Sequence, residues 1–255
     1  ATLTNGLSVR VEAERFLSIV DDEVAAISYR VTANEAANVE LAPFLDFNVV
    51  NSDANWEETF WAQQGHASAA GQGHIHAKTK KLDFHVAAAM HCEVSAEGQP
   101  LSATASGREG YAESSYSAAL EAGQSVHVLK YVGVVNSLNA APESVVARAE
   151  EQAQQAAAKG YDTLRSAHAN AWMAKWELAD IRIDGDDSAQ QGIRFNIFHL
   201  LQTFTGVDAR LNIGPKGFTG EKYGGSTYWD TEAYCLPFYM ASTDQSVAKN
   251  LLVYR

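Results

Sequence analysis

The hydrophobic period of the chain changes at Pro142, and this change constrains the fold more than any other feature. Before Pro142, apolar and polar residues alternate along short segments, which is the period of a strand with one buried face. After it, apolar residues recur at three- and four-residue steps, which is the period of a helix. The sequence therefore predicts a β part followed by an α part, as two domains or as one domain and a piece of another.

The β part extends from residue 1 to about residue 140. The alternation is clearest over residues 8–13, 27–31, 38–48, 82–94 and 125–135. Several short strands at this spacing, separated by turn-forming residues, predict an antiparallel β-sandwich. Residues 51–66, which include two tryptophans, do not alternate, and we expect a long loop there.

We expect three helices in the part that follows, over residues 142–159, from about residue 162, and over about residues 188–204. Gly160 favours an end to the first helix. Residues 184–187 (DGDD) resemble the start of a calcium loop, but the later ligands of such a loop do not follow. We therefore interpret these aspartates as a turn and a helix N-cap.

The chain ends at Arg255 inside a fourth helical pattern. Val247, Leu251, Leu252 and Tyr254 recur at helical spacing, and no Gly, Asn or Pro follows to end the helix. This ending is typical of a fragment of a longer chain, and a natural C-terminal helix with a frayed end is the alternative.

Composition and charge exclude several classes of function. The net charge is −12, and no basic stripe is visible, which disfavours nucleic-acid binding. The longest apolar stretches, such as residues 86–90, are too short to span a membrane, and the N-terminus shows no signal-peptide pattern. Cys92 and Cys235 lie too far apart in sequence to indicate a disulfide scaffold or a zinc site. We expect a cytoplasmic protein with no membrane or nucleic-acid partner.

The histidines give little indication of a metal site. His74 and His76 share one face of a strand, but no third ligand is suggested nearby, so we favour a solvated strand face. His168 and His199 fall in helical segments and are expected to pack or to form hydrogen bonds. Cys92 has no apparent partner, which favours an inert buried thiol.

Residues 214–232 combine glycines, aromatic residues and carboxylates at high density. Their glycine spacing fits no nucleotide-binding fingerprint, whereas long segments of this composition are usually functional. Trp229 and Asp230 suit a sugar, because an indole offers a flat apolar face and a carboxylate accepts strong hydrogen bonds from hydroxyl groups. The alternative is that Trp229 is a core residue, while Asp230 and Glu232 cap a helix. The composition leaves both interpretations open.

The order of residues is more specific than the composition. Residues 214–225 (GPKGFTGEKYGG), followed by 228–234 (YWDTEAY), resemble the disaccharide phosphorylases of glycoside hydrolase family 65, most of all those that act on maltose. Residues 14–18, 172–176 and 183–186 also resemble the family. The resemblance therefore covers most of the chain.

This resemblance implies an architecture. Family members have an N-terminal β-sandwich, a helical linker, an (α/α)6-barrel catalytic domain and a small C-terminal β-domain. We expect residues 1–140 to form most of the sandwich, residues 141–180 the linker, and residues 181–255 only the beginning of the barrel. Because family members are much longer than this chain, the resemblance also agrees with the uncapped end at Arg255.

The resemblance also implies an activity, which is inverting phosphorolysis of maltose to β-D-glucose 1-phosphate and D-glucose. Inorganic phosphate is then a co-substrate, and no cofactor and no metal are expected. Trp229 and Asp230 are expected to bind the glucosyl unit that is transferred. The general acid of the family, a glutamate, is expected beyond Arg255, so we assign no catalytic residue to this chain, Glu232 included, and expect the chain alone to be inactive.

Three alternatives remain at this point. One is another phosphorylase of the family, acting on trehalose, kojibiose or nigerose. The second is a non-catalytic carbohydrate-binding β-sandwich with a helical appendage. The third is a structural or assembly module, because sandwiches of the family contribute to dimer contacts. We expect a homodimer for the full-length protein.

Overall fold

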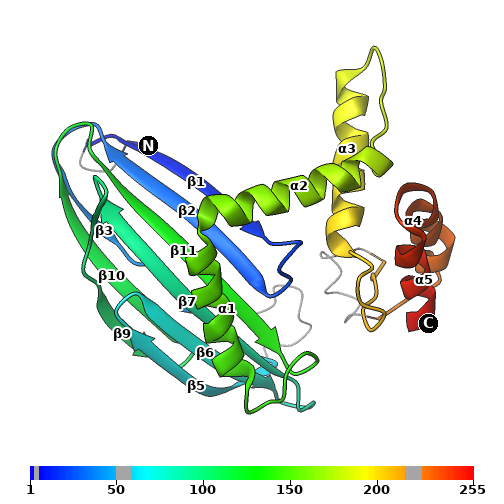
Figure 1. Ribbon diagram of the computed structural model, residues 1–255, viewed down its shortest axis with the longest axis horizontal. Helices are drawn as coiled ribbons and strands as arrows, with labels where there is room; N and C mark the ends of the chain where they lie inside the picture. The colour runs from blue at the N-terminus through cyan, green and yellow to red at the C-terminus, as the bar shows by residue number, and fades with distance from the viewer. Residues whose placement is uncertain (3–5, 50–58, 216, 218–225) are drawn as a thin grey trace. The chain divides into compact units, whose positions relative to one another are not determined.

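The computed structural model describes residues 1–2, 6–49, 59–215, 217 and 226–255 (Figure 1). These residues form two compact units. The first contains the described residues up to Ala169, and the second contains those from Asn170 onward. Helix α2 (Tyr161–Ala179) contributes to both units.

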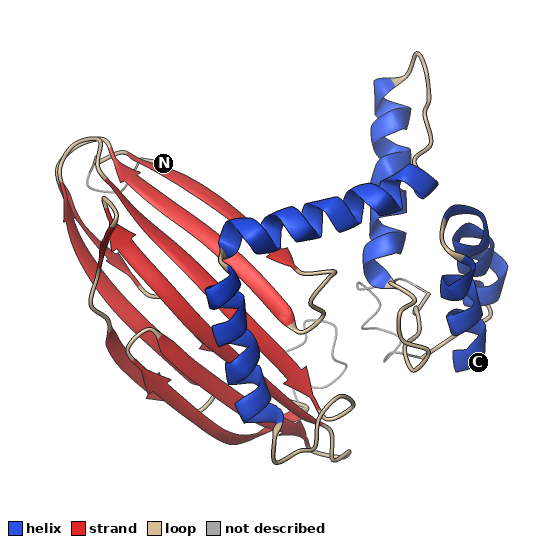
Figure 2. Ribbon diagram, viewed as in Figure 1, coloured by secondary structure: helices blue, strands red, loops and turns tan. Residues whose placement is uncertain are grey.

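The first unit contains two antiparallel sheets, shown in red in Figure 2. The larger sheet has the order β1-β2-β11-β7-β6-β5, and short β8 pairs with β7. In the smaller sheet β10 is central, and β3, β4 and β9 all pair with it. The strand bounds are β1 (Val9–Leu17), β2 (Val24–Ala33), β3 (Ala37–Leu41), β4 (Phe44–Asp46), β5 (Trp61–Ala69), β6 (Gln72–Thr79), β7 (His85–Ala96), β8 (Gln99–Pro100), β9 (Thr104–Arg108), β10 (Tyr111–Leu120) and β11 (Ser125–Asn136).

The larger sheet is covered on both faces. On β11, Val126 and Val128 pack in a core with Tyr116 of the smaller sheet. Tyr131 and Val135 point the other way, because side chains alternate along a strand, and pack against helices α1 and α2. The protein therefore has an antiparallel β-sandwich with a helix layer on one outer face, followed by further helices, which confirms the predicted fold class.

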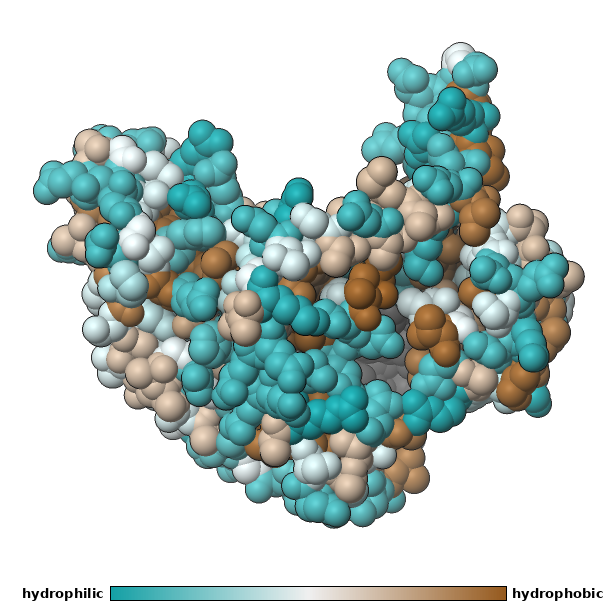
Figure 3. Space-filling view, in the orientation of Figure 1, coloured by the Kyte–Doolittle hydropathy of each residue, from teal (hydrophilic) through white to brown (hydrophobic). Residues whose placement is uncertain are grey.

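Helix α1 (Val145–Lys159) lies along that outer face (Figure 1). Its buried stripe consists mainly of small residues: Val145, Ala149, Ala153 and Ala156. Its outward-facing side is polar, and hydrophilic side chains cover this face of the unit in Figure 3. Gly160, with φ of 81°, ends the helix as predicted, because a left-handed conformation favours glycine.

The starts of helices α1 and α3 lie close to the positions that the sequence pattern predicts. Helix α1 begins at Val145, three residues later than the predicted start at Pro142. Helix α3 (Asp187–Thr203) begins with the Asp186 carboxylate accepting a hydrogen bond from the Ala189 amide at 2.9 Å. The aspartates of residues 184–187 therefore include a helix N-cap, as interpreted. The domain boundaries at residues 140 and 180 stay predictions.

Two strands depart from the sequence prediction. The loop prediction over residues 51–66 is wrong from Trp61 onward, because β5 begins there and pairs with β6, while residues 51–58 lie outside the described part. This strand lies at the sheet edge with mostly exposed side chains, so no buried face imposes an alternation. Strand β10 was not predicted, because its inward residues include Ala112, Ser114 and Ala118, which form a weak apolar pattern.

The second unit contains α3, a π-helical turn η3 (Thr231–Cys235), α4 (Leu236–Ser242) and α5 (Gln245–Tyr254). Its core includes Phe204, Ile213, Tyr239, Val247, Ala248 and Leu251. The predicted apolar face of the last helix is only partly right, because Leu252 and Tyr254 are 51% and 43% exposed. No helix among the described residues is both long and apolar enough to cross a membrane.

The contact between α1 and the larger sheet depends on Gly133 of β11. A Cβ atom at this position would clash with the Ala149 carbonyl oxygen and lie 3.0 Å from the Ala153 amide nitrogen. We expect Gly133→Ala to lower the free energy of unfolding of the first unit by about 1–3 kcal/mol, as overpacking does. Denaturant unfolding would measure it. Gly65→Ala is the matched control, because a Cβ there has open space; equal effects of the two variants would contradict this account.

Candidate functional site

The segment that carries the family resemblance forms an unusual helix start. The Tyr228 and Trp229 carbonyls accept hydrogen bonds from the Thr231 and Ala233 amides, at 3.1 and 3.0 Å. From Asp230 the chain enters the π-helical turn η3 and continues into α4, which has a proline in its first turn. Single π-helical turns are rare and occur frequently at functional sites.

Thr231 attaches this turn to the chain before the glycine-dense segment. Its side chain is 1% exposed, and its hydroxyl donates a hydrogen bond to the Ile213 carbonyl at 3.1 Å. The residue after Ile213, Gly214, lies near the Ser226 carbonyl. The two described ends of the glycine-dense segment are therefore held close together. Lys216 and residues 218–225, where much of the resemblance falls, lie outside the described residues.

Trp229 is exposed in this structure, at 65%, and its ring centroid lies 5.8 Å from that of Tyr234, which is 67% exposed. The two rings are tilted by 47°. The alternative that Trp229 is a core residue therefore finds no support. Exposed indole and phenol rings provide a flat apolar surface of the kind that packs against the C–H groups of a pyranose.

The two carboxylates of the segment differ in their partners. Glu232 forms an ion pair with Arg255, whose guanidinium also donates to the Thr227 hydroxyl. The half-buried Asp230 precedes the π-helical turn, and its carboxylate makes no capping hydrogen bond to it. Asp230 therefore occupies the N-cap position of η3 without forming a side-chain cap among the described residues.

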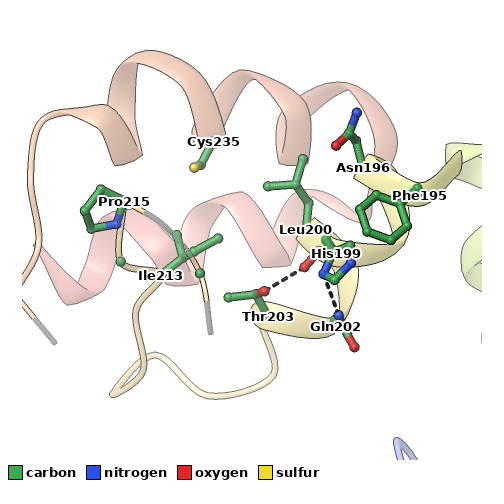
Figure 4. Close-up of a pocket in the computed structure, with 11 residues that line it drawn as sticks. Phe195, Asn196, His199, Leu200, Gln202, Thr203, Ile213, Pro215 and Cys235 are labelled. Atoms are coloured by element: carbon green, nitrogen blue, oxygen red, sulfur yellow. Dashed lines mark hydrogen bonds between the residues drawn. The ribbon is translucent and has the colours of Figure 1, made fainter. Parts of the chain in front are cut away.

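A cavity of about 630 Å³ lies beside this segment in the second unit (Figure 4). Helix α3 contributes Phe195, His199 and Thr203 to its wall, and the π-helical turn contributes Cys235. Burial raises the pKa of the Cys235 thiol, with further contributions from the nearby Asp230 and Glu232 carboxylates. The volume is in the usual range for small-molecule sites.

The polar groups of this cavity are held in place by local contacts. The Gln202 amide is hydrogen-bonded to His199 Nδ1 at 2.9 Å, and the His199 ring packs edge-on against Phe195 at 4.2 Å. The Thr203 hydroxyl donates to the His199 carbonyl at 2.6 Å. Trp229 and Asp230 do not line this cavity. Our sequence interpretation missed His199 as a cavity residue, although residues 195, 199 and 203 recur at a four-residue spacing next to the buried face of α3.

The histidine pair on β6 is not the solvated strand face that we predicted. His74 Nδ1 lies 2.7 Å from a Glu150 carboxylate oxygen on α1, and His76 Nε2 lies 2.9 Å from His85 Nδ1. Helix α1 covers this face, which the strand pattern alone did not indicate. No group of three or more His, Cys, Asp or Glu residues in the described part of the chain is arranged to hold a metal ion.

The remaining candidate residues behave as structural groups. Cys92 is buried, as expected, and burial raises the pKa of its thiol to about 12, so the nucleophilic thiolate is absent at neutral pH. The His168 ring packs against Phe16 at 4.8 Å, and burial lowers its pKa.

Two family models match this chain of a β-sandwich followed by helices. The model of the "Glycosyl hydrolase family 65, N-terminal domain" matches residues 1–175, and that of the "Glycosyl hydrolase family 65 central catalytic domain" matches residues 194–255. The chain belongs to glycosyl hydrolase family 65.

Several characterised and solved relatives are phosphorylases. The chain is 42% identical to maltose phosphorylase of Bacillus subtilis (strain 168), over 97% of this chain and 33% of that protein. It is 29% identical to α,α-trehalose phosphorylase of Thermoanaerobacter brockii, over 98% of this chain and 33% of that protein. The solved structure of a candidate kojibiose phosphorylase from the human microbiome has a TM-score of 0.88 and 26% identity, over 99% of this chain and 33% of that chain. The chain therefore spans about a third of the length of these relatives.

The half-buried His76 provides a pH test of the sandwich. Burial, and then the neighbouring His85 and His74, lower its pKa from the usual value of 6.5. Because the unfolded chain then binds more protons, this residue contributes stability that is present above pH 6.5 and is lost as pH falls through the lower folded pKa.

We therefore expect the melting temperature of the chain to fall less between pH 8 and pH 5 in His76→Gln than in the wild type, because glutamine stays neutral. Thermal unfolding followed by circular dichroism at several pH values measures this. His66→Gln removes an exposed histidine of the same sheet and should leave the dependence unchanged. An unaltered pH dependence in His76→Gln would show that another group is responsible.

Proposed function

We propose that this chain is part of a disaccharide phosphorylase and that Trp229 and Asp230 bind the glucosyl unit that is transferred. One observation carries the proposal: an exposed indole directly precedes a carboxylate that does not cap the π-helical turn following it. An apolar ring face next to a charged hydrogen-bond acceptor suits a pyranose, which has apolar C–H faces and equatorial hydroxyl groups.

The reaction that we propose is inverting phosphorolysis of maltose. A phosphate oxygen attacks the anomeric carbon of the non-reducing glucosyl unit while the bond to the glycosidic oxygen breaks. A general acid protonates that oxygen, and the products are β-D-glucose 1-phosphate and D-glucose. The 42% identity to a maltose phosphorylase and the order of residues 214–234 support maltose over trehalose, kojibiose or nigerose.

Asp230 is proposed to act by binding, not by proton transfer. Hydrogen bonds from sugar hydroxyls to a carboxylate strengthen as positive charge develops on the sugar ring in the transition state. Glu232 is already engaged by Arg255, which supports a structural role for it. We propose that a glutamate outside residues 1–255 supplies the acid proton, so that the chain alone does not catalyse the reaction.

Other properties of the whole enzyme belong to the same proposal. We infer that it acts as a cytoplasmic homodimer with inorganic phosphate as co-substrate and without a cofactor or metal ion. These inferences rest on the resemblance to the family. The alternative of a non-catalytic binding sandwich has less support, because residues 194–255 match a central catalytic domain.

The substrate proposal is tested with the full-length protein and a panel of four disaccharides. Maltose, trehalose, kojibiose and nigerose are each incubated with inorganic phosphate, and the sugar phosphate is identified by ¹H NMR, which distinguishes the anomers. We expect β-glucose 1-phosphate, with the highest kcat/KM for maltose. A higher kcat/KM for another disaccharide would reject maltose as the preferred substrate, and formation of the α anomer would reject inversion.

The role of Asp230 is tested by Asp230→Asn in the same full-length protein. Loss of charged hydrogen bonds worth about 1.5–3 kcal/mol should lower kcat/KM by about 10- to 100-fold. Glu177→Gln, which neutralises an exposed carboxylate in the same unit, is the matched control. If Asp230→Asn keeps the wild-type kcat/KM, Asp230 does not bind the reacting sugar.

A further inference from the structure

A second cavity, of about 560 Å³, lies in the sandwich unit, and none of the residues that line it belongs to the proposed sugar site. Strands β2 and β11 of the larger sheet form one wall with Ile27, Tyr29 and Val128. The other wall is formed by the end of β3 at Leu41, the connecting residues Ala42 and Pro43, and the start of β4 at Phe44. Apart from Lys130, the residues that line it are apolar or aromatic.

Lys130 enters this cavity because of its register on β11. Val128 and Val132, two residues before and after it, pack in the cores between the sheets. Side chains of a strand alternate between its faces, so Lys130 also points inward. It is paired across the ladders with Ile27 on β2 and Cys92 on β7. In the sequence, this position is recognisable as a lysine at an inward position among the alternating valines Val126, Val128 and Val132.

The Lys130 ammonium has one hydrogen-bond partner and no counter-ion. It donates to the Phe44 carbonyl of β4 and lies 5.9 Å from the Phe44 ring centroid. No carboxylate among the described residues forms an ion pair with it. Burial lowers its pKa, and the charge that opposes this effect is that of the Cys92 thiol, which is itself protonated at neutral pH.

These observations specify the chemistry of a ligand. The half-buried Lys130 ammonium has no anionic partner among the described residues, and it has three donors, of which the Phe44 carbonyl uses one. Apart from the Tyr29 phenol, the side chains of the walls provide no further polar group for a sugar or a phosphate, both of which need several hydrogen-bond partners. A single carboxylate on an apolar body would match both the cation and the walls, and the volume is in the usual range for small-molecule sites.

We propose that this cleft between the sheets binds a small amphiphilic monocarboxylate, whose carboxylate pairs with Lys130 and whose apolar body packs against Ile27, Tyr29 and Val128. The site does not depend on the proposed phosphorolysis, because none of its residues belongs to the sugar-binding segment.

The test uses octanoate and 1-octanol, which share an apolar chain and differ in charge, with the full-length protein and isothermal titration calorimetry. We expect octanoate to bind at one site about tenfold more tightly than 1-octanol, the gain typical of a charged hydrogen bond. Lys130→Met should abolish this preference and leave the affinity for 1-octanol within about twofold, because the apolar walls remain. Equal affinity of the wild type for both probes, no octanoate binding at millimolar concentration, or a preference retained in Lys130→Met would overturn the proposal.

Two further variants control the result. Lys81→Met removes an exposed lysine of the same unit and should keep the octanoate preference, whereas Val128→Phe should fill the cleft and weaken both probes. Thermal unfolding verifies that each variant is folded, and phosphorolysis activity should be unchanged in Lys130→Met.

A measurement on the wild type does not depend on the folding of any variant. The groups that face the amine are the Cys92 thiol from β7 and the Tyr29 phenol from β2. As pH rises and the Lys130 amine loses its proton, octanoate affinity should fall to that of 1-octanol, at a pH below the usual lysine pKa of 10.5. An octanoate affinity that does not change over this range would also overturn the proposal.

Discussion

Close approach between a helix backbone and a strand backbone organises the first unit. Gly133 on β11 lets the backbone of α1 approach closely, and small side chains such as Ala87, Ala89 and Ala149 fill the contact around this point. The same layer of contacts shields His76 and brings Glu150 to His74. The larger sheet is thus buried on both faces, although only one of its partners is another sheet.

The residues proposed to bind the sugar lie in the second unit, whereas most polar groups of the first unit stabilise its fold. The sandwich satisfies most of its buried polar groups within its own ladders and ion pairs, and the Lys130 ammonium, which donates to the Phe44 carbonyl, has no carboxylate partner among the described residues. In the helical unit, exposed aromatic rings and the Asp230 carboxylate follow one another directly along the chain. Charged groups without an oppositely charged or capping partner among the described residues indicate where a ligand is expected.

Helices and strands could be predicted from the sequence where burial of one face gave them a clear hydrophobic period. Elements with a wide apolar stripe or a glycine end, such as α1 and α3, were predicted closely. The edge strand β5 and the Ala- and Ser-rich strand β10 were not, because their side chains carry little hydrophobic contrast. The proposal for Trp229 and Asp230 came from the order of residues around them, and it stays a prediction. His199 and the His74–Glu150 contact required the tertiary structure, since their partners come from other elements or turns.

The π-helical turn η3 affects the direction in which Trp229 and Asp230 point. Such a turn contains one residue more than an α-helical turn, and each residue of an α-helix rotates the chain by about 100°. Removing one residue from Thr231–Cys235 would convert it into an ordinary turn and rotate Trp229 and Asp230 by about that angle relative to α4. The additional residue of the turn therefore sets the direction in which the indole and the carboxylate point. This effect does not depend on which side chains line the turn.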